Sequence, residues 1–342
     1  LAISYEITQR HGGEIAVRPW AQDRVRIQAT HSSRDWIEVS TSSSAVRVEA
    51  ESRHGMPHLV EYQITVPVWM PLQLSGVSTD VRVEGTRAAI HIETVEGHVT
   101  VTGGADEVSA ESVEGDVSVS GARGRVNAHS VDGAVRLDDI IGDITAESVD
   151  GNITIQGAQS ANVDASTVDG DIYYVGTIRD GGRYDLATHD GGVTFSLPEG
   201  ANATVTIATF DGEFDSSFPI PLQRTEPGRR FTFTLGTGSA RIQLETFDGQ
   251  ILMRRPTEIR IPASDESGHG THVVGSVVGD QAPWNEVSPA DGQAYRARIF
   301  FQDLNVGGGL TVSPPSDYFN NLFGPAYDPN GNGGGGTITV TL

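Results

Sequence analysis

Two features of the sequence place reactive side chains at spacings that could support chemistry. The first is a pair of histidines, His269 and His272, which follow Asp265 and Glu266 in a glycine-containing segment. An imidazole of this kind can act as the general base that activates a serine nucleophile, provided that an aspartate orients the ring. Alternatively, two histidines three residues apart can share one face of a helix and bind a metal ion together with nearby carboxylates.

The second feature is an acidic residue that returns at a nearly fixed interval. The sequence [Thr/Ser]-Val-[Asp/Glu]-Gly occurs five times, and three looser copies follow in which His or Phe replaces the valine. The intervals between the glycines are 18 residues three times, then 19, 21, 21 and 37. The last interval could hold one further copy whose sequence has degenerated. The eight glycines are Gly97, Gly115, Gly133, Gly151, Gly170, Gly191, Gly212 and Gly249.

Stacked copies would align their carboxylates, and aligned carboxylates could bind calcium. Calcium takes about six to eight oxygen ligands and usually more than one carboxylate per ion. The repeat supplies one main acid per copy, so we expect no cofactor, and Asp132, Asp150 and Asp169 are the candidate ligands if calcium does bind. We expect the acid and the glycine to form a corner instead, in which the glycine adopts positive φ and the carboxylate accepts local backbone N–H bonds.

The residues between the acidic corners alternate between apolar and polar side chains. Val117 and Val119 share one face, and Val126, Ala128 and, past a bend, Val131 do the same in the next copy. This period of two predicts half-buried β-strands, two in each copy. Further glycine corners are expected between these strands, near Gly103, Gly121, Gly142 and Gly157.

One copy cannot bury its apolar face alone, but stacked copies can, because each valine then lies above the valine of the preceding coil. The expected fold class is therefore all-β: a single-stranded parallel β-helix (β-solenoid) with coils about 4.8 Å apart. A meander of antiparallel hairpins is the alternative, since Asp-Gly also favours hairpin turns. The length of the repeat and the small residues at equivalent positions favour the solenoid.

Residues 3–255 resemble a bacterial family of domains of unknown function whose members are described as proposed adhesins. The resemblance rests on phrases such as SVDGNI at 148–153, on VRPW at 17–20 and on IQLETFDG at 242–249. It implies a single-stranded β-helix, right-handed, with a surface role and often a membrane anchor. It implies no catalytic residues.

Residues 264–328 resemble subtilisin-like serine proteases. The resemblance rests on DESGHGTHVVGSVVG at 265–279, and it implies that His269 occupies the position of the catalytic base and that neither histidine binds a metal. The aspartate motif expected before His269 and the serine motif expected after it are missing here, so we expect no catalytic residues and no peptide hydrolysis by this chain. The alternative is that the chain is part of a secreted subtilisin-like protease.

These observations divide the chain into five segments. Residues 1–70 are expected to form an N-terminal β lead-in that caps the solenoid, with Trp20, Trp36 and Trp69 packed into its end; carbohydrate stacking is their alternative role. Residues 71–255 form the solenoid repeats, 256–263 a linker and 264–329 a small mixed α/β, subtilisin-like segment. Residues 330–342 form a glycine-rich tether and a terminal strand that could be donated to a neighbouring subunit. The strand comprises Thr337, Ile338, Thr339, Val340, Thr341 and Leu342.

The composition limits the partners. The 342 residues contain 23 Lys and Arg against 45 Asp and Glu, a formal net charge of −22. Nucleic acid and anionic lipid both need clustered basic residues, so we expect neither as a partner. No apolar run is long enough to span a membrane. Because the chain begins at Leu1, we expect a processed or truncated N-terminus.

The expected function is that of a non-catalytic structural or adhesive solenoid, extracellular or on a bacterial cell surface. Its partners would be further copies of itself, in a fibre, or a surface ligand. A β-helix enzyme that acts on carbohydrate is a further alternative, but it would need carboxylates clustered on one face of the solenoid.

Overall fold

The structure of the protein, a computed structural model, describes residues 4–9, 12–33, 35–41, 45–53, 59–220, 230–259 and 261. The chain divides into two units, Leu1–Pro262 and Ala263–Leu342. All described residues belong to the first unit. The predictions for residues 264–342, which include the base position His269 and the terminal strand at 337–342, therefore lie outside the described residues.

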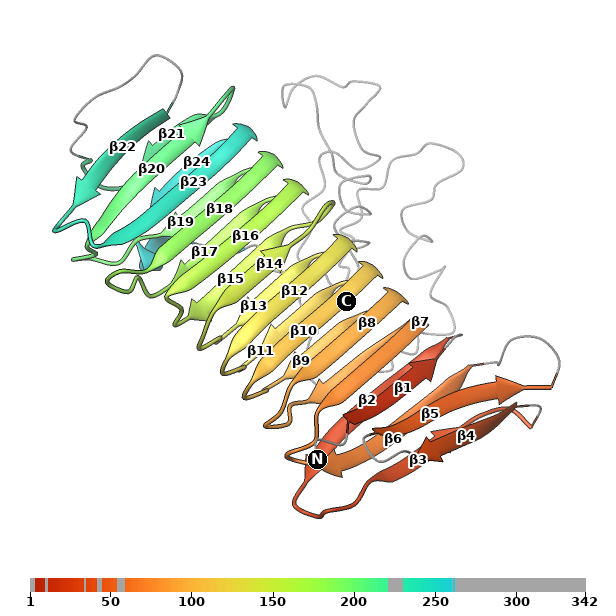
Figure 1. The fold of residues 1–342 in the computed structure, drawn as a ribbon. Coiled ribbons are helices and arrows are strands. Elements are labelled where there is room, and N and C mark those ends of the chain that lie inside the picture. Colours follow the sequence, from red (N-terminus) through yellow and green to blue (C-terminus); the bar gives the residue numbers. More distant parts are fainter. Residues whose placement is uncertain are drawn as a thin grey trace, which may run out of the picture. The chain divides into compact units, whose positions relative to one another are not determined.

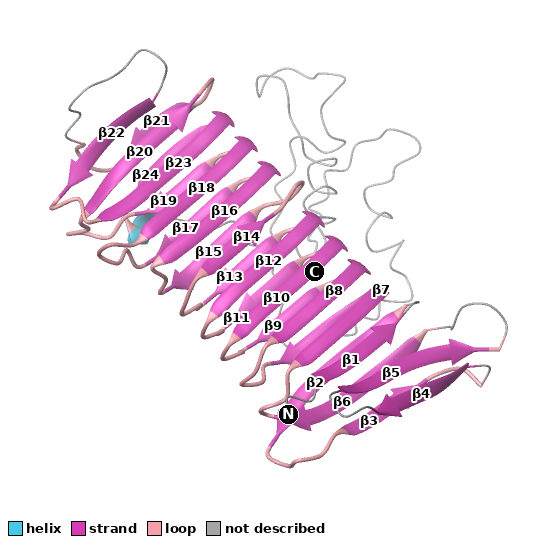
Figure 2. Ribbon diagram, viewed as in Figure 1, coloured by secondary structure: helices cyan, strands magenta, loops and turns pink. Residues whose placement is uncertain are grey.

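Two β-sheets, which share the long strand β7 (Leu72–Glu84), make up almost the whole of the first unit (Figures 1 and 2). In spatial order, sheet A contains β4 (Asp35–Thr41), β5 (Ala45–Ser52), β1 (Ser4–Gln9), β7, β8 (Ile90–Glu96), β10 (Glu107–Glu114), β12 (Arg125–Asp132), β14 (Ile144–Glu147), β16 (Asn162–Asp169), β18 (Arg183–Asp190), β23 (Ala240–Asp248), β20 (Ala203–Thr209) and β22 (Arg230–Leu235). Sheet B contains β3 (Arg26–Thr30), β6 (Val60–Pro67), β2 (Gly13–Trp20), β7, β9 (Val99–Thr102), β11 (Val117–Ser120), β13 (Val135–Asp138), β15 (Ile153–Ala158), β17 (Ile172–Gly176), β19 (Val193–Ser196), β24 (Gln250–Arg254) and β21 (Glu213–Ser216).

Each coil contributes one strand to each sheet, and equivalent strands of successive coils pair in parallel. Val117, for example, pairs with Val99 of the preceding coil and with Val135 of the following coil, 18 residues away on either side. This pairing confirms the predicted β-solenoid and rules out a hairpin meander for the repeats. Its handedness stays a prediction. The predicted glycine corners are also confirmed, because Gly103, Gly121, Gly142 and Gly157 have φ between 67° and 143°.

The core lies between the two sheets and is built from the alternate residues of every strand. Sheet B contributes valine and isoleucine, whereas the middle of sheet A contributes mostly small residues, such as the fully buried Ala110, Ala146 and Ala165. Towards the C-terminal coils the core becomes aromatic. Tyr174 stacks on Phe195 with ring centroids 4.9 Å apart, and these rings need the wider coils that the 21-residue intervals provide.

The order of the coils departs from the order of the sequence at both ends of the solenoid. The last coil, β23 and β24, lies between β18/β19 and β20/β21, as the blue-green strands among the green ones show (Figure 1). At the other end β1 and β2 lie between β5/β6 and β7. The described part of the 37-residue interval before Gly249 holds β22 and no further coil, so the prediction of a degenerate copy there is wrong.

Antiparallel strands close both ends of the described solenoid. At the N-terminal end β3 pairs with β6 and β4 with β5, and at the C-terminal end β22 pairs with β20. Such strands cover an open sheet edge that would otherwise invite aggregation. The prediction that tryptophans plug the end is wrong for Trp36 and Trp69, which are exposed; Trp69 donates from Nε1 to Asp23 at 3.0 Å. Trp20 is half-buried and donates from Nε1 to the backbone oxygen of Arg24 at 2.7 Å.

After β24 the described chain ends in a single 3-10 turn, η1 (Pro256–Glu258), shown in cyan in Figure 2. It lies in the segment that the sequence indicates to be a linker. Within the part of the chain that the structure describes, no helix is long and apolar enough to cross a membrane.

Candidate binding surface

The repeated phrase forms a similar corner in successive coils, and its hydroxyl residue lies inside; the exception in bonding is Thr209, whose hydroxyl accepts from the Gly212 N–H at 2.7 Å. The Ser130 side chain is fully buried, and its Oγ donates to the backbone oxygen of Gly115 in the preceding coil at 2.9 Å. Each such hydroxyl satisfies a carbonyl that the corner would otherwise bury without a partner. The equivalent donors, at 2.9–3.1 Å, are Thr94, Ser112, Ser148, Thr167, Thr188 and Thr246.

The glycine of the phrase is required by the close approach of neighbouring coils. At Gly115, where φ is +149°, a Cβ atom would lie 2.3 Å from the backbone oxygen of Gly97. Positive φ, as predicted, occurs at five of the eight phrase glycines and not at Gly133, Gly151 and Gly212. The close approach is a further reason for glycine that the sequence did not reveal, because a side chain would strike the coil beneath. The hydroxyl therefore reaches a carbonyl that only a glycine leaves accessible.

The residue that follows the hydroxyl points outward. The alternation Val126, Ala128, Ser130 continues through the bend, so Ser130 is buried and Val131 is half-buried on the outer side. The prediction that Val131 joins the inner face with Val126 is therefore wrong. The signal that could have corrected it is the hydroxyl itself, which occupies the inward position in every copy.

We use the name apolar column for the outward residues that follow the hydroxyls along the stack, together with Val77, which follows Gly76, the residue that pairs with Thr94. Seven of them are exposed hydrophobic side chains, from 38% to 67% of their surface. The register of the flanking residues places them directly above one another. The apolar column comprises Val77, Val95, Val113, Val131, Val149, Val168, His189, Phe247 and Phe210.

The far end of the apolar column is aromatic. The ring of Phe247 stacks on His189 on one side and on Phe210 on the other, with both centroid distances 4.7 Å and interplanar angles of 6° and 8°. The spacing equals that between adjacent strands, about 4.8 Å, so the coil stack itself holds the rings face to face. The faces of the three rings therefore point along the column, towards one another.

The acidic residues of the phrase form a second straight column beside the first. The predicted calcium candidates Asp132, Asp150 and Asp169 are brought together, because Asp150 bridges to the other two across adjacent coils. We use the name acid column for the seven exposed members Glu96, Glu114, Asp132, Asp150, Asp169, Asp190 and Asp248.

The negative charges of the acid column have almost no hydrogen-bond or ion-pair partners among the described residues. Its carboxylates accept no backbone N–H bond from described residues, so the predicted local role of these acids is wrong, and only Glu96 accepts a hydroxyl bond, from Ser78 at 2.8 Å. None of the ion pairs in the described residues includes a member of the column. In the same residues no group of three or more potential metal ligands occurs. Calcium binding by Asp132, Asp150 and Asp169 stays an untested hypothesis.

The residue after the glycine performs the backbone role that the sequence assigned to the phrase acid. Asp116 Oδ1 accepts the N–H of Ala134 in the next coil at 2.9 Å, and Asp171 Oδ1 accepts that of Gly192 at 2.7 Å. Asp143 accepts from the side chain of Asn162 at 2.9 Å. These extra acids therefore help to hold neighbouring coils together.

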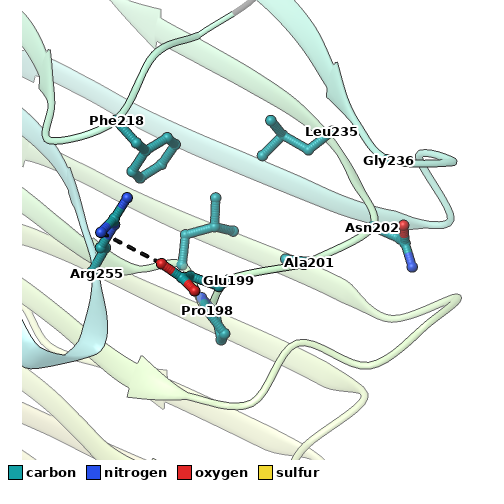
Figure 3. A pocket seen from close by; sticks show the side chains of 10 residues that line it. Pro198, Glu199, Ala201, Asn202, Phe218, Leu235, Gly236 and Arg255 are labelled. Carbon is teal, nitrogen blue, oxygen red and sulfur yellow. Dashed lines mark ion pairs between the residues drawn. The ribbon is translucent and has the colours of Figure 1, made fainter.

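Two hollows lie near the C-terminal coils. One, of about 370 Å³, lies beside the acid column and is lined by Asp171, Asp190, Asp248 and neighbouring glycines. The other, of about 390 Å³, lies among Leu197, Phe218 and Leu235, and Figure 3 shows the ion pair between Arg255 and Glu199, 3.4 Å, at its side.

The comparisons with known proteins address the repeat region. A family model, Toastrack DUF4097, matches residues 7–254, and no curated protein matches the chain. Among solved structures, that of a proposed cell adhesion protein from Clostridium sporogenes aligns with 74% of this chain and 92% of its own, at 10% identity and a TM-score of 0.21. A score this low supports no conclusion about common function.

No comparison supports the resemblance of residues 264–328 to subtilisin-like proteases, and those residues lie beyond the family match. The match itself covers 248 of 342 residues, and it spans every strand from β2 to β24. The parallel coils and their repeated corners agree with the fold that the resemblance of residues 3–255 implied. The chain belongs to the Toastrack DUF4097 family.

Proposed function

We propose that this chain is a non-catalytic structural or adhesive protein of the bacterial cell surface or the extracellular space. The observation that carries the proposal is the exposed pair of columns, in which the same outward side chains recur at every coil along one edge of the solenoid. A stack of hydrogen-bonded coils holds these side chains at fixed spacing, so the edge offers many equivalent contacts in a row. Repeated contacts of this kind suit attachment, because many weak contacts add to a strong one.

Surface location is tested on intact cells of the source bacterium. Brief treatment with an added protease should remove the solenoid epitope from intact cells, while a cytoplasmic marker protein in the same cells stays uncut. An epitope that is cut only after lysis would contradict the proposal. Loss of attachment by a deletion strain, restored by the intact gene, would connect the location with adhesion.

The alternative, a subtilisin-like protease, is tested with a serine-reactive fluorophosphonate probe and a fluorogenic peptide. We expect neither labelling nor cleavage by the purified full chain. The matched control is His269→Ala, which should behave as the parent does. Labelling of the parent that the His269→Ala variant lacks would show that the chain works as a protease.

Assembly into a fibre by donation of the strand Thr337–Leu342 is the finer form of the proposal. In the described unit, the outermost strands to which a neighbouring subunit's donated strand could add are β3, β4, β21 and β22. Deletion of residues 331–342 should reduce the particle mass measured by light scattering. An unchanged mass, with the parent itself larger than a monomer, would exclude this strand as the connection.

A further inference from the structure

The apolar column and the acid column run side by side along the same edge, and together they describe a partner. The apolar column exposes seven large hydrophobic side chains along one line, interrupted only by the half-buried Val131 and by His189. Scattered single exposures are the norm for a soluble surface. The adjoining acid column carries seven carboxylates, none of which forms an ion pair with a described residue. A partner that fits must be apolar along one line and positively charged along the next.

We infer that this double column binds a basic amphipathic polypeptide segment, whose aliphatic side chains cover the apolar column and whose lysines or arginines face the acid column. The inference rests on the proposed adhesive role, and it names the chemical class of ligand for that role. Binding would remove the valines from water and would also supply the countercharges that the acid column lacks.

The dimensions of the column fit a helical segment. From Glu96 to Asp248 the acid column spans six coil steps, about 29 Å at the ordinary strand spacing of about 4.8 Å. A helix of that length has about 19 residues at 1.5 Å per residue. Its turns repeat every 5.4 Å or so, close to the coil spacing, whereas residues on one side of an extended chain repeat about every 6.8 Å. A helix therefore keeps successive charges nearer to successive carboxylates.

Charge argues against the other occupants of this edge. A second copy would bring its own acid column against the first, and an anionic lipid surface or a nucleic acid would be repelled in the same way. Residues 263–342 of this chain contain eight Asp and Glu but only two Arg, a net charge of 2 − 8 = −6, so this segment does not complement the acid column either.

The experiment measures the binding of a labelled 18-residue Leu/Lys model helix to the full chain by fluorescence anisotropy. The variant Glu114→Gln/Asp132→Asn/Asp150→Asn should weaken binding at least tenfold at low salt. The matched control Glu61→Gln/Asp106→Asn/Asp164→Asn removes the same charge from exposed positions outside the columns, and it should stay within twofold of the parent. Equal weakening by both variants would mean diffuse attraction to the net charge, and it would overturn the inference.

A second variant tests the apolar column. Val95→Ser/Val113→Ser/Val149→Ser should weaken the binding of the model helix at least tenfold. A scrambled peptide of equal composition should bind the parent protein at least tenfold more weakly than the amphipathic helix does. Equal binding of scrambled peptide and model helix would overturn the inference. So would a lower sedimentation coefficient of this variant without peptide, since the column would then hold a second copy.

The two proposals fail separately. If purified protein binds no amphipathic peptide, the partner class is wrong, but protease treatment of intact cells still decides the surface location. If the solenoid proves to be intracellular, the surface role is wrong, while the peptide titration keeps its meaning for the purified protein. The three triple variants alter exposed side chains, and unchanged circular dichroism confirms that each one folds.

Discussion

At the scale of residues, each corner of the solenoid depends on a buried hydroxyl and on a glycine that lets neighbouring coils approach each other. The buried Ser130 hydroxyl needs an acceptor, and the Gly115 oxygen needs a donor. Either group would be costly to bury alone. The corner therefore selects Ser or Thr by its hydrogen bond rather than by its apolarity, which is why a polar residue occupies an inward position in all copies.

The first prediction concerns this bond. Replacement Ser130→Ala leaves the Gly115 carbonyl without its side-chain donor, and we expect a loss of about 1–3 kcal/mol in the free energy of unfolding. Denaturant titration followed by circular dichroism measures it. The matched control is Ser130→Thr, the residue that Thr94, Thr167 and Thr188 supply in other coils, and it should cost less than half as much. A similar loss for both replacements would refute the role of the hydroxyl.

The second prediction concerns two buried tyrosines with opposite environments. The Tyr62 hydroxyl is buried with no partner among the described residues, whereas the Tyr184 hydroxyl donates to Ser160 and accepts from the Arg179 N–H, both at 2.8 Å. Tyr62→Phe should therefore raise the free energy of unfolding by roughly 1 kcal/mol, and Tyr184→Phe should lower it by about 1–3 kcal/mol. The same titration compares the two signs, and a lower stability of Tyr62→Phe would reveal a partner for that hydroxyl.

At the scale of elements, alternation and glycine spacing were sufficient to predict which segments form coils. They placed Val117, Val119, Val126 and Ala128 on the inner faces, where the structure has them. They did not predict that β23/β24 inserts before β20/β21, because every coil offers the same parallel edges to its neighbours. Stacking order depends on contacts between segments far apart in sequence, and a local period contains no information about them.

The candidate surface was predictable only in part. The alignment of Asp132, Asp150 and Asp169 follows directly from stacking, and the structure confirms that alignment. The apolar column was missed, since a valine in an alternating strand is ordinarily an inward residue and Val131 was counted as one. Continuing the alternation from Val126 through Ala128 to Ser130 places Val131 outside. That alternation requires a buried serine, which is unexpected because serine is usually exposed.

The third prediction concerns the strand that closes the C-terminal end. Phe233 of β22 is buried, and β22 covers the outer edge of β20. Phe233→Ala should destabilise the protein by about 3–5 kcal/mol through the cavity that it leaves. It should also release β22 and expose the β20 edge to other chains. Light scattering on warming should show that Phe233→Ala aggregates at a temperature below the unfolding midpoint of the parent. The control Phe210→Ala changes an exposed side chain and should aggregate at the same temperature as the parent. If the two variants aggregated at the same temperature, β22 would not act as a cap.

At the scale of the whole molecule, the buried tyrosines make the free energy of unfolding depend on pH in the alkaline range. Burial raises the pKa of Tyr62 to about 12, and burial together with Asp171 raises the pKa of Tyr173 to about 12. Burial also raises the pKa of Tyr174 and Tyr184. Unfolded tyrosines ionise near pH 10 or so, so the unfolded state loses its protons first.

The fourth prediction is the sign and range of that dependence. A raised folded pKa means that the stabilisation is complete below about pH 10 and is lost as the pH rises towards about 12. Phenolate absorbance at 295 nm and the strand signal in circular dichroism should therefore change together in this range. Formation of all eight phenolates near pH 10 or so, with the strand signal intact, would show that the buried tyrosines are accessible in the folded state.

The acid column makes the fifth prediction, which concerns salt. Seven in-register carboxylates about 4.8 Å apart repel one another, and dissolved ions screen this repulsion. Raising NaCl from 0.05 to 0.5 M should therefore raise the midpoint temperature of thermal unfolding measured by circular dichroism. Asp150→Asn should stabilise the protein by roughly 0.2–1 kcal/mol at low salt and reduce its salt dependence. Glu147→Gln, an exposed acid with Ser166 and His129 as its neighbours, should do neither. A cationic partner would relieve the repulsion among the column carboxylates, and this relief would favour its binding. If Asp150→Asn and Glu147→Gln changed the salt dependence equally, the inferred binding surface would lose its electrostatic basis.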